Sequence, residues 1–216
     1  MNTPQVIDKF ESNYSFLSNF APSQIRLQLL GRTWVFATGE HAFQVAKVAV
    51  SDLSDESKLL WVEKMAANTE PEDAKHMGRS ISIDKAQWSR ISYITMRRVQ
   101  ELKYEQNSDL RANLLATESA TLIEGNTWND TLWGQVNGKG KNQLGIILMD
   151  LRKRLLFERL IDSAWVIMVE QQHHSAEGWS MAKSWAWDQL QEAFAPFRNS
   201  EGDYYDLEKI RAVVNT

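Results

Sequence analysis

A chain of 216 residues with 43% hydrophobic and 24% charged residues is typical of a soluble globular protein with a sizeable core. Its formal net charge of -4 argues against a general nucleic-acid binder, which needs a basic surface. It leaves open an enzyme that takes one modified nucleotide into a pocket. The chain contains no cysteine, which excludes disulfides, thiolate zinc sites and cysteine nucleophiles.

The N-terminal residues lack the basic and apolar regions of a secretory signal, and no apolar run approaches the roughly 20 residues that span a bilayer. We therefore expect a cytoplasmic protein without a membrane partner.

The first third of the chain predicts strands. Residues 6–11 and 25–36 have strand character, and the second range turns at Leu30-Gly31-Arg32, which predicts a β-hairpin. Between them, residues 14–22 are rich in aromatic and small polar residues and are expected to form a loop that plugs a sheet or lines a pocket.

Helices are expected over most of the rest. Thr38 is a candidate N-cap for a helix over residues 38–50, and Asp55–Ala67 is amphipathic. Pro71 and the acids around it predict another helix start, with an end near residues 77–79. A segment from Asp84, a long helix from Trp88 to about Gln106 and a short one over 109–116 follow.

The later part of the chain predicts a strand over 121–124, a polar and glycine-rich loop, and a helix from Leu144. Residues 158–216 are expected to add two or three helices packed on the core, among them Ala176–Phe194. The expected fold is α+β and mostly helical, with a small N-terminal β-sheet or hairpin packed on helices and a helical C-terminal extension.

Glu40 and Asp130 are the acidic residues that stand out. Glu40 lies in the first turn of its helix, where the macrodipole favours a carboxylate, and Lys47 follows two turns later. The alternative is an ordinary capped amphipathic helix. Asp130 lies between Trp128 and Trp133, and a carboxylate among aromatic rings concentrates its field on a nearby cation. The alternative for Asp130 is plain turn chemistry.

Two other patterns are weak. Residues 138–142 precede a helix and are rich in glycine and lysine, which suits a phosphate, but they match neither a Walker A motif nor a dinucleotide fingerprint. His173 and His174 are adjacent, so a helix would point them apart, and joint metal binding is not expected.

Several short blocks, in this order, resemble the NADAR family (YbiA-like proteins) over about residues 8–157. The blocks are residues 16–20 (FLSNF), 39–47 (GEHAFQVAK), Gly78-Arg79, Trp88, 130–134 (DTLWG), 140–145 (GKNQLG), Leu148-Met149 and Leu151-Arg152.

The resemblance implies an N-glycosidase with a compact, mostly helical α+β fold that needs no cofactor and no metal. Members of the family cleave phosphoribosylated aminopyrimidine intermediates of riboflavin synthesis or remove ADP-ribose from guanine in DNA. The implied substrate is an ADP-ribosylated or phosphoribosylated nucleobase, with modified DNA as one source, and the oligomeric state is left open.

The resemblance also implies roles for single residues. Glu40 and Asp130 match the acidic positions and Trp88 the tryptophan of the family pattern, which makes these three the candidate catalytic residues. Glu40 would activate water or hold the ribose hydroxyls, Asp130 would stabilise the cationic ribosyl carbon, and Trp88 would stack on the base or ring. Which of the two acids is the general base is left open, because that depends on their separation and on the pose of the substrate. Seven further residues match positions that line or support the pocket: Ser18, Asn19, Phe20, Lys47, Arg79, Trp133 and Asn142. Of these, Lys47 and Arg79 would pair with phosphate.

The chain departs from the family pattern at two places. Ala37-Thr38-Gly39 precedes the Glu-His pair where the family often has serine, and residues 158–216 have no counterpart in the minimal pattern. We therefore expect a catalytic domain over 1–157 and an extension over 158–216, with Trp179, Trp185 and Trp187 as anchors. Dimerisation, cover of the site and partner selection are open roles for the extension.

Two other classes of function compete with the enzyme. A non-catalytic ADP-ribose-binding module would keep Lys47 and Arg79 but dispense with the acids, whereas Glu40 and Asp130 are both present. An interaction protein that uses the tryptophan-rich tail would tolerate loss of both acids.

Overall fold

The structure, a computed structural model, describes residues 5–170, with the backbone alone over 160–170. The chain divides into two compact units, residues 1–151 and 152–216. The helix expected over Ala176–Phe194, its tryptophans Trp179, Trp185 and Trp187, and the pair His173-His174 lie outside the described residues. The domain boundary at residue 157 stays a prediction.

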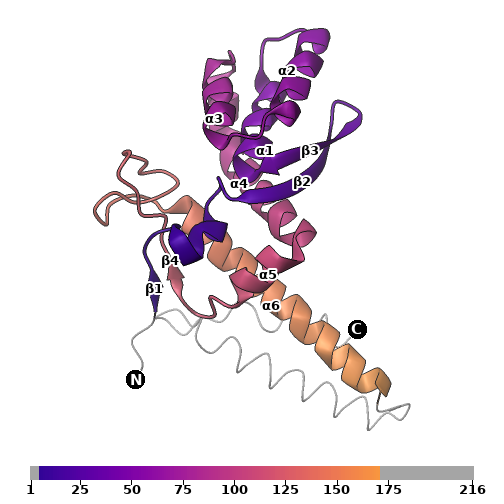
Figure 1. The fold of residues 1–216 in the computed structure, drawn as a ribbon, viewed down its shortest axis with the longest axis vertical. Helices are drawn as coiled ribbons and strands as arrows, with labels where there is room; N and C mark the ends of the chain where they lie inside the picture. The colour runs from indigo at the N-terminus through magenta and orange to yellow at the C-terminus, as the bar shows by residue number, and fades with distance from the viewer. Residues whose placement is uncertain (1–4, 171–216) are drawn as a thin grey trace. The chain divides into compact units, whose positions relative to one another are not determined.

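An antiparallel hairpin is formed by β2 (Pro22–Leu29) and β3 (Arg32–Thr38), with Leu27 opposite Trp34. Leu30 and Gly31 both have positive φ, the backbone that a two-residue hairpin turn requires. Ile25 and Phe36, which pair across the strands, are completely buried. The predicted hairpin is confirmed, although β2 begins three residues earlier than expected (Figure 1).

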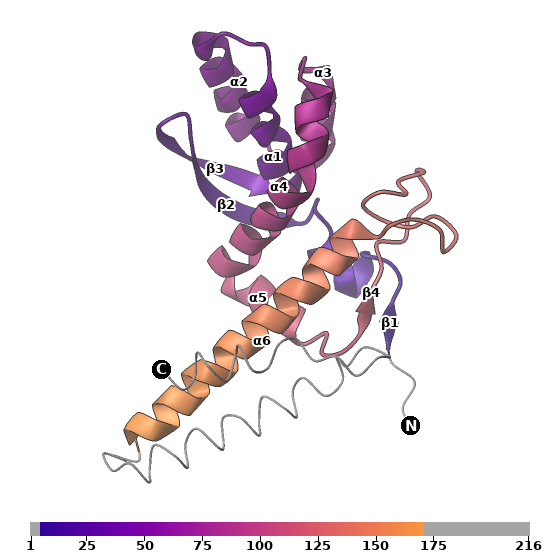
Figure 2. The ribbon, with the colours of Figure 1, turned by 180° about the vertical axis from the view of Figure 1, so that it is seen from behind.

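The helix α1 (Gly39–Val45) continues directly from β3. Its N-cap is Thr38, whose hydroxyl accepts a hydrogen bond from the backbone N–H of His41 at 3.4 Å, as the sequence predicts. A 3₁₀ helix, η2 (Ala46–Val50), extends it. Every residue of α1 is buried, because α2, α3, α4 and the hairpin surround it in both views (Figures 1 and 2).

The helices that follow are α2 (Asp55–Ala67), α3 (Pro71–Ser80), α4 (Lys85–Gln106) and α5 (Ser108–Leu115). Pro71 occupies the first turn of α3, and the carboxylate of Asp84 accepts the backbone N–H groups of Ala86 and Gln87 at 2.9 and 3.0 Å. The two segments expected after Asp84 are one continuous helix, because that cap starts α4 before Trp88.

A second, very small sheet pairs β1 (Val6–Ile7) in parallel with β4 (Thr121–Leu122). Both strands are shorter than expected. The helix α6 (Gln143–Glu170) begins after the loop that follows β4. None of the helices over 5–170 is long and apolar enough to cross a membrane.

The segment before the hairpin differs from its expectation. Residues 14–22 were expected to form a loop, but Ser12–Leu17 form a 3₁₀ helix, η1. Leu17 is completely buried, and the ammonium group of Lys103 on α4 donates to the carbonyls of Phe16 and Ser18 at 2.8 and 2.7 Å. These contacts satisfy the end of η1 and hold the next residues, Ser18 to Phe20, in place.

Candidate active site

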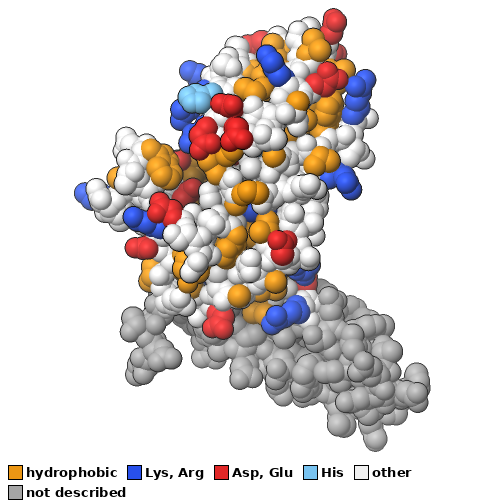
Figure 3. Space-filling model, viewed as in Figure 1, with side chains coloured by type: hydrophobic (Ala, Val, Ile, Leu, Met, Phe, Trp, Pro, Cys, Tyr) orange, Lys and Arg blue, Asp and Glu red, His pale blue; other side chains and the backbone are white. Residues whose placement is uncertain are grey.

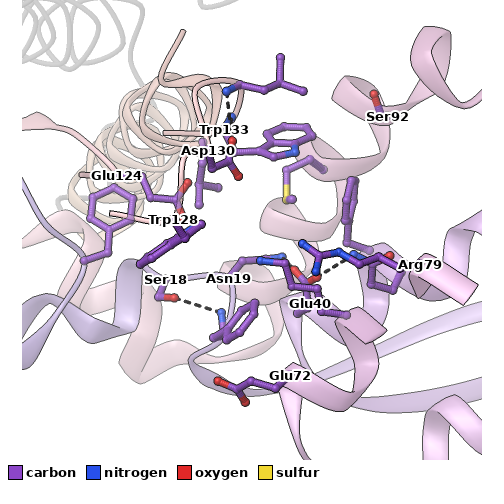
Figure 4. A pocket seen from close by; sticks show the side chains of 18 of the residues that line it. Ser18, Asn19, Glu40, Glu72, Arg79, Ser92, Glu124, Trp128, Asp130 and Trp133 are labelled. Atoms are coloured by element: carbon purple, nitrogen blue, oxygen red, sulfur yellow. Dashed lines mark hydrogen bonds between the residues drawn. The ribbon is translucent and has the colours of Figure 1, made fainter. Parts of the chain in front are cut away.

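A cavity of about 720 Å³ opens in the first unit, between α1, α3, α4, the residues after η1 and the loop after β4. Figure 3 shows it as a hollow with acidic side chains at its rim, and Figure 4 shows its interior. Nine of the ten predicted site residues line it: Ser18, Asn19, Phe20, Glu40, Lys47, Arg79, Trp88, Asp130 and Trp133.

Glu40 is the buried carboxylate on α1. Its Oε2 accepts a hydrogen bond from the side-chain amide of Asn19 at 2.8 Å, and its Oε1 accepts one from that of Gln44 at 2.7 Å. Gln44 lies one helical turn after Glu40, so the helix itself sets this pair. Both oxygens keep a further lone pair for water or a substrate hydroxyl.

Asn19 connects Glu40 to α4. Its Oδ1 accepts from the side-chain amide of Gln100 at 2.8 Å, and its backbone carbonyl accepts the N–H of Glu40 at 2.9 Å. Gly39 permits this approach, because a Cβ there would collide with Oδ1 of Asn19. A chain of amides from α4 thus fixes one rotamer of Glu40.

Lys47 and Arg79 lie close to Glu40. The ammonium of Lys47 donates to the carbonyl of Gly78 at 2.6 Å and lies 5.7 Å from the centre of the Trp88 ring. Burial lowers the pKa of Lys47, while Glu40 acts to raise it and Arg79 to lower it further. Arg79 makes no ion pair with the described residues and extends into the cavity (Figure 4).

Three aromatic rings form one side of the cavity. Phe43 on α1 lies 5.2 Å from Trp88 and 5.4 Å from Trp133, between ring centroids, and meets Trp133 edge to face. Phe43 is buried, whereas both tryptophans are half-buried and keep surface for a ligand. Phe20 stands elsewhere on the lining with the ammonium of Lys75 5.3 Å from its centroid.

Asp130 makes the hydrogen bonds of a turn and also lines the cavity, so the two interpretations of its sequence position are compatible. Its Oδ1 accepts the backbone N–H groups of Leu132 and Trp133 at 3.0 and 2.9 Å, which is turn chemistry. The same carboxylate lines the cavity, and its Oδ2 makes no hydrogen bond with the described residues. The hydrogen bonds of the turn therefore hold Oδ1 of Asp130 and leave Oδ2 available to a ligand in the cavity.

Asn142 is the predicted residue that does not line the cavity. It is buried and supports the site from behind: its Oδ1 accepts the backbone N–H of Glu124 at 3.0 Å, and its amide donates to the carbonyl of Leu122 at 2.8 Å.

Glu124 is a functional candidate that the sequence reasoning missed. It lines the cavity just after β4, and burial together with Asp130 and Glu40 raises its pKa to about 8, although Lys75 opposes the shift. The signal that the sequence offers is a carboxylate at the end of the predicted strand over 121–124. Gln100 had none, because its partner Asn19 is 81 residues away.

No group of three or more His, Cys, Asp or Glu side chains that would suit a metal ion occurs among the residues that the structure describes.

Known proteins match the part of the chain that forms this cavity. The NADAR domain family matches residues 7–156. The "N-glycosidase YbiA" of Shigella boydii is 40% identical over 149 residues, which are 68% of this chain and 85% of that protein. The NMR structure of the Escherichia coli protein YbiA matches with a TM-score of 0.58 and 38% identity, over 74% of this chain and 90% of that one.

A third relative is larger than this chain. The "Riboflavin biosynthesis protein VVA0006" of Vibrio vulnificus is 32% identical over 161 residues, which are 72% of this chain but 39% of that protein.

The fold, the pocket with its carboxylates and the named N-glycosidases among the relatives together define the class of this protein. It is a hydrolase that acts on N-glycosyl bonds. Within that class, the chain belongs to the NADAR family. The expected mostly helical α+β fold is confirmed.

Proposed function

We propose that the protein hydrolyses the N-glycosidic bond between ADP-ribose and a nucleobase, with guanine in DNA or in a nucleotide as the substrate. The observation that carries this is the distribution of charge in one cavity. The carboxylates of Glu40, Glu124 and Asp130 line this cavity together with aromatic rings. Four cations from η2, α3 and the start of α4 line the same cavity: Lys47, Lys75, Arg79 and Lys85.

The carboxylates suit the reacting carbon. When an N-glycosidic bond breaks, positive charge develops on C1 and the ring oxygen of the ribose, and a nearby carboxylate stabilises it. Asp130, oriented by two backbone N–H groups, is the candidate for this role. Glu40, with lone pairs left beyond its two amide bonds, is the candidate to take a proton from water.

The cations suit phosphate. Arg79 and Lys85 make no ion pair within the described part of the chain, so their donors are available to a ligand. Lys47 already donates to the carbonyl of Gly78 and would contribute mainly its charge. Two cations with free donors, together with the charge of Lys47, suit the two phosphates of ADP-ribose.

A second candidate is a phosphoribosylated aminopyrimidine. The relative that favours it is the Vibrio vulnificus riboflavin biosynthesis protein, of which this chain matches a part. The same carboxylates would act on the same kind of bond, and only the number of phosphates and the leaving base would differ.

The test compares two substrates in one hydrolysis assay: an oligonucleotide that carries ADP-ribosyl guanine, and a phosphoribosylated aminopyrimidine. The proposal expects release of ADP-ribose from the first by the wild type. Glu40→Gln, which keeps the shape but loses the charge, should reduce kcat by about 100-fold or more. The matched control is Glu63→Gln, an exposed residue of α2 whose loss should leave kcat unchanged.

The other outcomes separate the alternatives. Release of ribose 5-phosphate from the second substrate alone identifies the metabolite enzyme. If neither substrate is cleaved but ADP-ribose raises the melting temperature, the protein is a binding module. Full activity of Glu40→Gln removes Glu40 from the mechanism.

A further inference from the structure

Three of the carboxyl groups that line the cavity, those of Glu40, Asp130 and Glu124, are held in different ways. Each oxygen of Glu40 accepts an amide hydrogen bond, and Oδ1 of Asp130 accepts two backbone N–H groups. The protein itself therefore directs hydrogen-bond donors at the carboxylate oxygens of both residues.

Glu124 has the opposite surroundings. Its Oε2 is shielded from solvent and has no hydrogen-bond partner among the described residues. A shielded oxygen without a donor disfavours the carboxylate and favours the protonated acid. The pKa of about 8 agrees with this, so most of the Glu124 population carries a proton at neutral pH.

Burial is the largest cause of the raised pKa of Glu124, and the charged groups that face this residue add to it. Asp130 from the same loop and Glu40 from α1 repel a third negative charge, and Lys75 from α3 only partly compensates. The remaining charged groups on the cavity lining are Glu11, Lys47, Glu72, Arg79 and Lys85.

The backbone of Glu124 is fixed, so its side chain enters the cavity from a defined point. Its N–H donates to Oδ1 of Asn142 at 3.0 Å, and its carbonyl accepts the N–H of Gln135 at 2.9 Å. In Figure 4, Glu124 and Asp130 enter from one side of the open space and Glu40 and Arg79 from the other. A ribosyl group between them would meet an acid and a base on different sides.

We propose that Glu124 is the catalytic acid of this site and protonates the nitrogen of the departing base. This inference rests on the proposed N-glycosidase function. Water attacks C1 of the ribosyl group, and the C1–N bond breaks with its electron pair going to nitrogen. The proton of Glu124 moves to that nitrogen, so the base leaves neutral, and Glu40 accepts the proton that the water loses. Exchange with solvent then restores both carboxyl groups.

The assignment also defines the substrate class. An amino nitrogen of guanine or of an aminopyrimidine is a poor leaving group as an anion and needs a proton to depart. A base bound through a cationic ring nitrogen leaves neutral without one, so an acid at this place serves the first kind of substrate.

The test is the pH dependence of kcat/KM for whichever of the two substrates the wild type cleaves, measured from pH 6 to 9.5. The wild type should lose activity above pH about 8 as Glu124 ionises. Glu124→Gln keeps the shape without a transferable acid proton. It should reduce kcat by about 100-fold or more, abolish the loss above pH 8 and leave KM within about threefold. Glu63→Gln should keep the wild-type profile.

Two results would overturn the assignment: a Glu124→Gln variant with wild-type kcat, or one that is slow but retains the loss of activity above pH 8. If that variant does not fold, the wild type decides alone, because a flat profile from pH 6 to 9.5 also contradicts an acid at this position. Failure of the proposed function looks different, since the wild type would then cleave neither substrate at any pH.

Discussion

Asn19 shows how much of this site depends on single side chains that do no chemistry. Its amide group donates to Glu40 and accepts from Gln100, and its backbone carbonyl accepts from the N–H of Glu40. Asn19 and Glu40 are both buried, so water does not reach their polar groups freely. Their hydrogen bonds must therefore come from the protein. The orientation of Glu40 is therefore set by residues from two other segments of the chain.

Asn19→Ala should weaken both stability and activity. The variant leaves Oε2 of Glu40 and the amide of Gln100 without their partner in a buried place, which costs about 1–3 kcal/mol of unfolding free energy. We also expect kcat to fall by about tenfold or more, because Glu40 gains alternative rotamers. Urea unfolding and steady-state kinetics measure the two effects. Asn13→Ala, an exposed residue of η1, is the control; equal losses in both variants would show that the amide chain is unimportant.

At the scale of elements, the contact of α1 with α3 brings the acid and the cations together. Gly78 on α3 lies against Gln44 of α1, the residue that donates to Oε1 of Glu40. The carbonyl of the same glycine accepts from Lys47. The close approach of the two helices therefore aligns an acidic group from one with the cation Arg79 from the other.

Gly78→Ala should separate these helices. A Cβ at this position would collide with the Cβ, Cδ and Oε1 atoms of Gln44, so rotation of the side-chain end alone does not relieve it. Overpacking of this kind costs about 1–3 kcal/mol, which outweighs the gain of at most about 1 kcal/mol from alanine in a helix. Thermal unfolding should show a lower Tm, with reduced kcat. In contrast, His76→Ala, at an exposed position of α3, should change neither, and a Gly78→Ala variant with wild-type Tm would contradict the tight contact.

The whole molecule shows which features are readable from the sequence. Thr38, Pro71 and Asp84 predict helix starts, because such residues cap a helix through a local hydrogen bond or have a fixed φ. The structure has a helix that begins at each of the three. The local sequence does not predict the parallel pairing of Val6 with Thr121, or the hydrogen bond from the side-chain amide of Gln100 to Asn19. Such contacts depend on segments that only the complete fold brings together.

The same limit applies to the site. Glu40 and Asp130 could be chosen because local features mark them, a helix start and a turn among tryptophans. The pKa of Glu124 is raised by burial and by the charges of Glu40 on α1 and Asp130 in its own loop, and the sequence alone does not show that these groups lie close together.

Buried ionisable groups should give the molecule a stability minimum near neutral pH. Burial raises the pKa of Glu124 from 4.5 to about 8, so the native state binds more protons than the unfolded state between these values. Its contribution to stability is complete below pH 4.5 and is lost as the pH rises to 8. Burial lowers the pKa of Lys103 from 10.5 to about 7, so here the unfolded state binds more protons, and stability rises from pH 7 to 10.5.

Urea unfolding from pH 5 to 9.5 measures this dependence. Each pKa unit corresponds to about 1.4 kcal/mol, so either group changes the free energy of unfolding by about 5 kcal/mol at most. Glu124→Gln should remove the decrease between pH 5 and 8. Lys103→Met should reduce the increase above pH 7, of which the lowered pKa of Lys47 retains a part. The carbonyls of Phe16 and Ser18 lose their donor in this variant, so overall stability falls. The decisive quantity is therefore the slope of the unfolding free energy against pH, not the absolute stability. Variants that keep the wild-type slope would show that these two groups do not titrate as their burial requires.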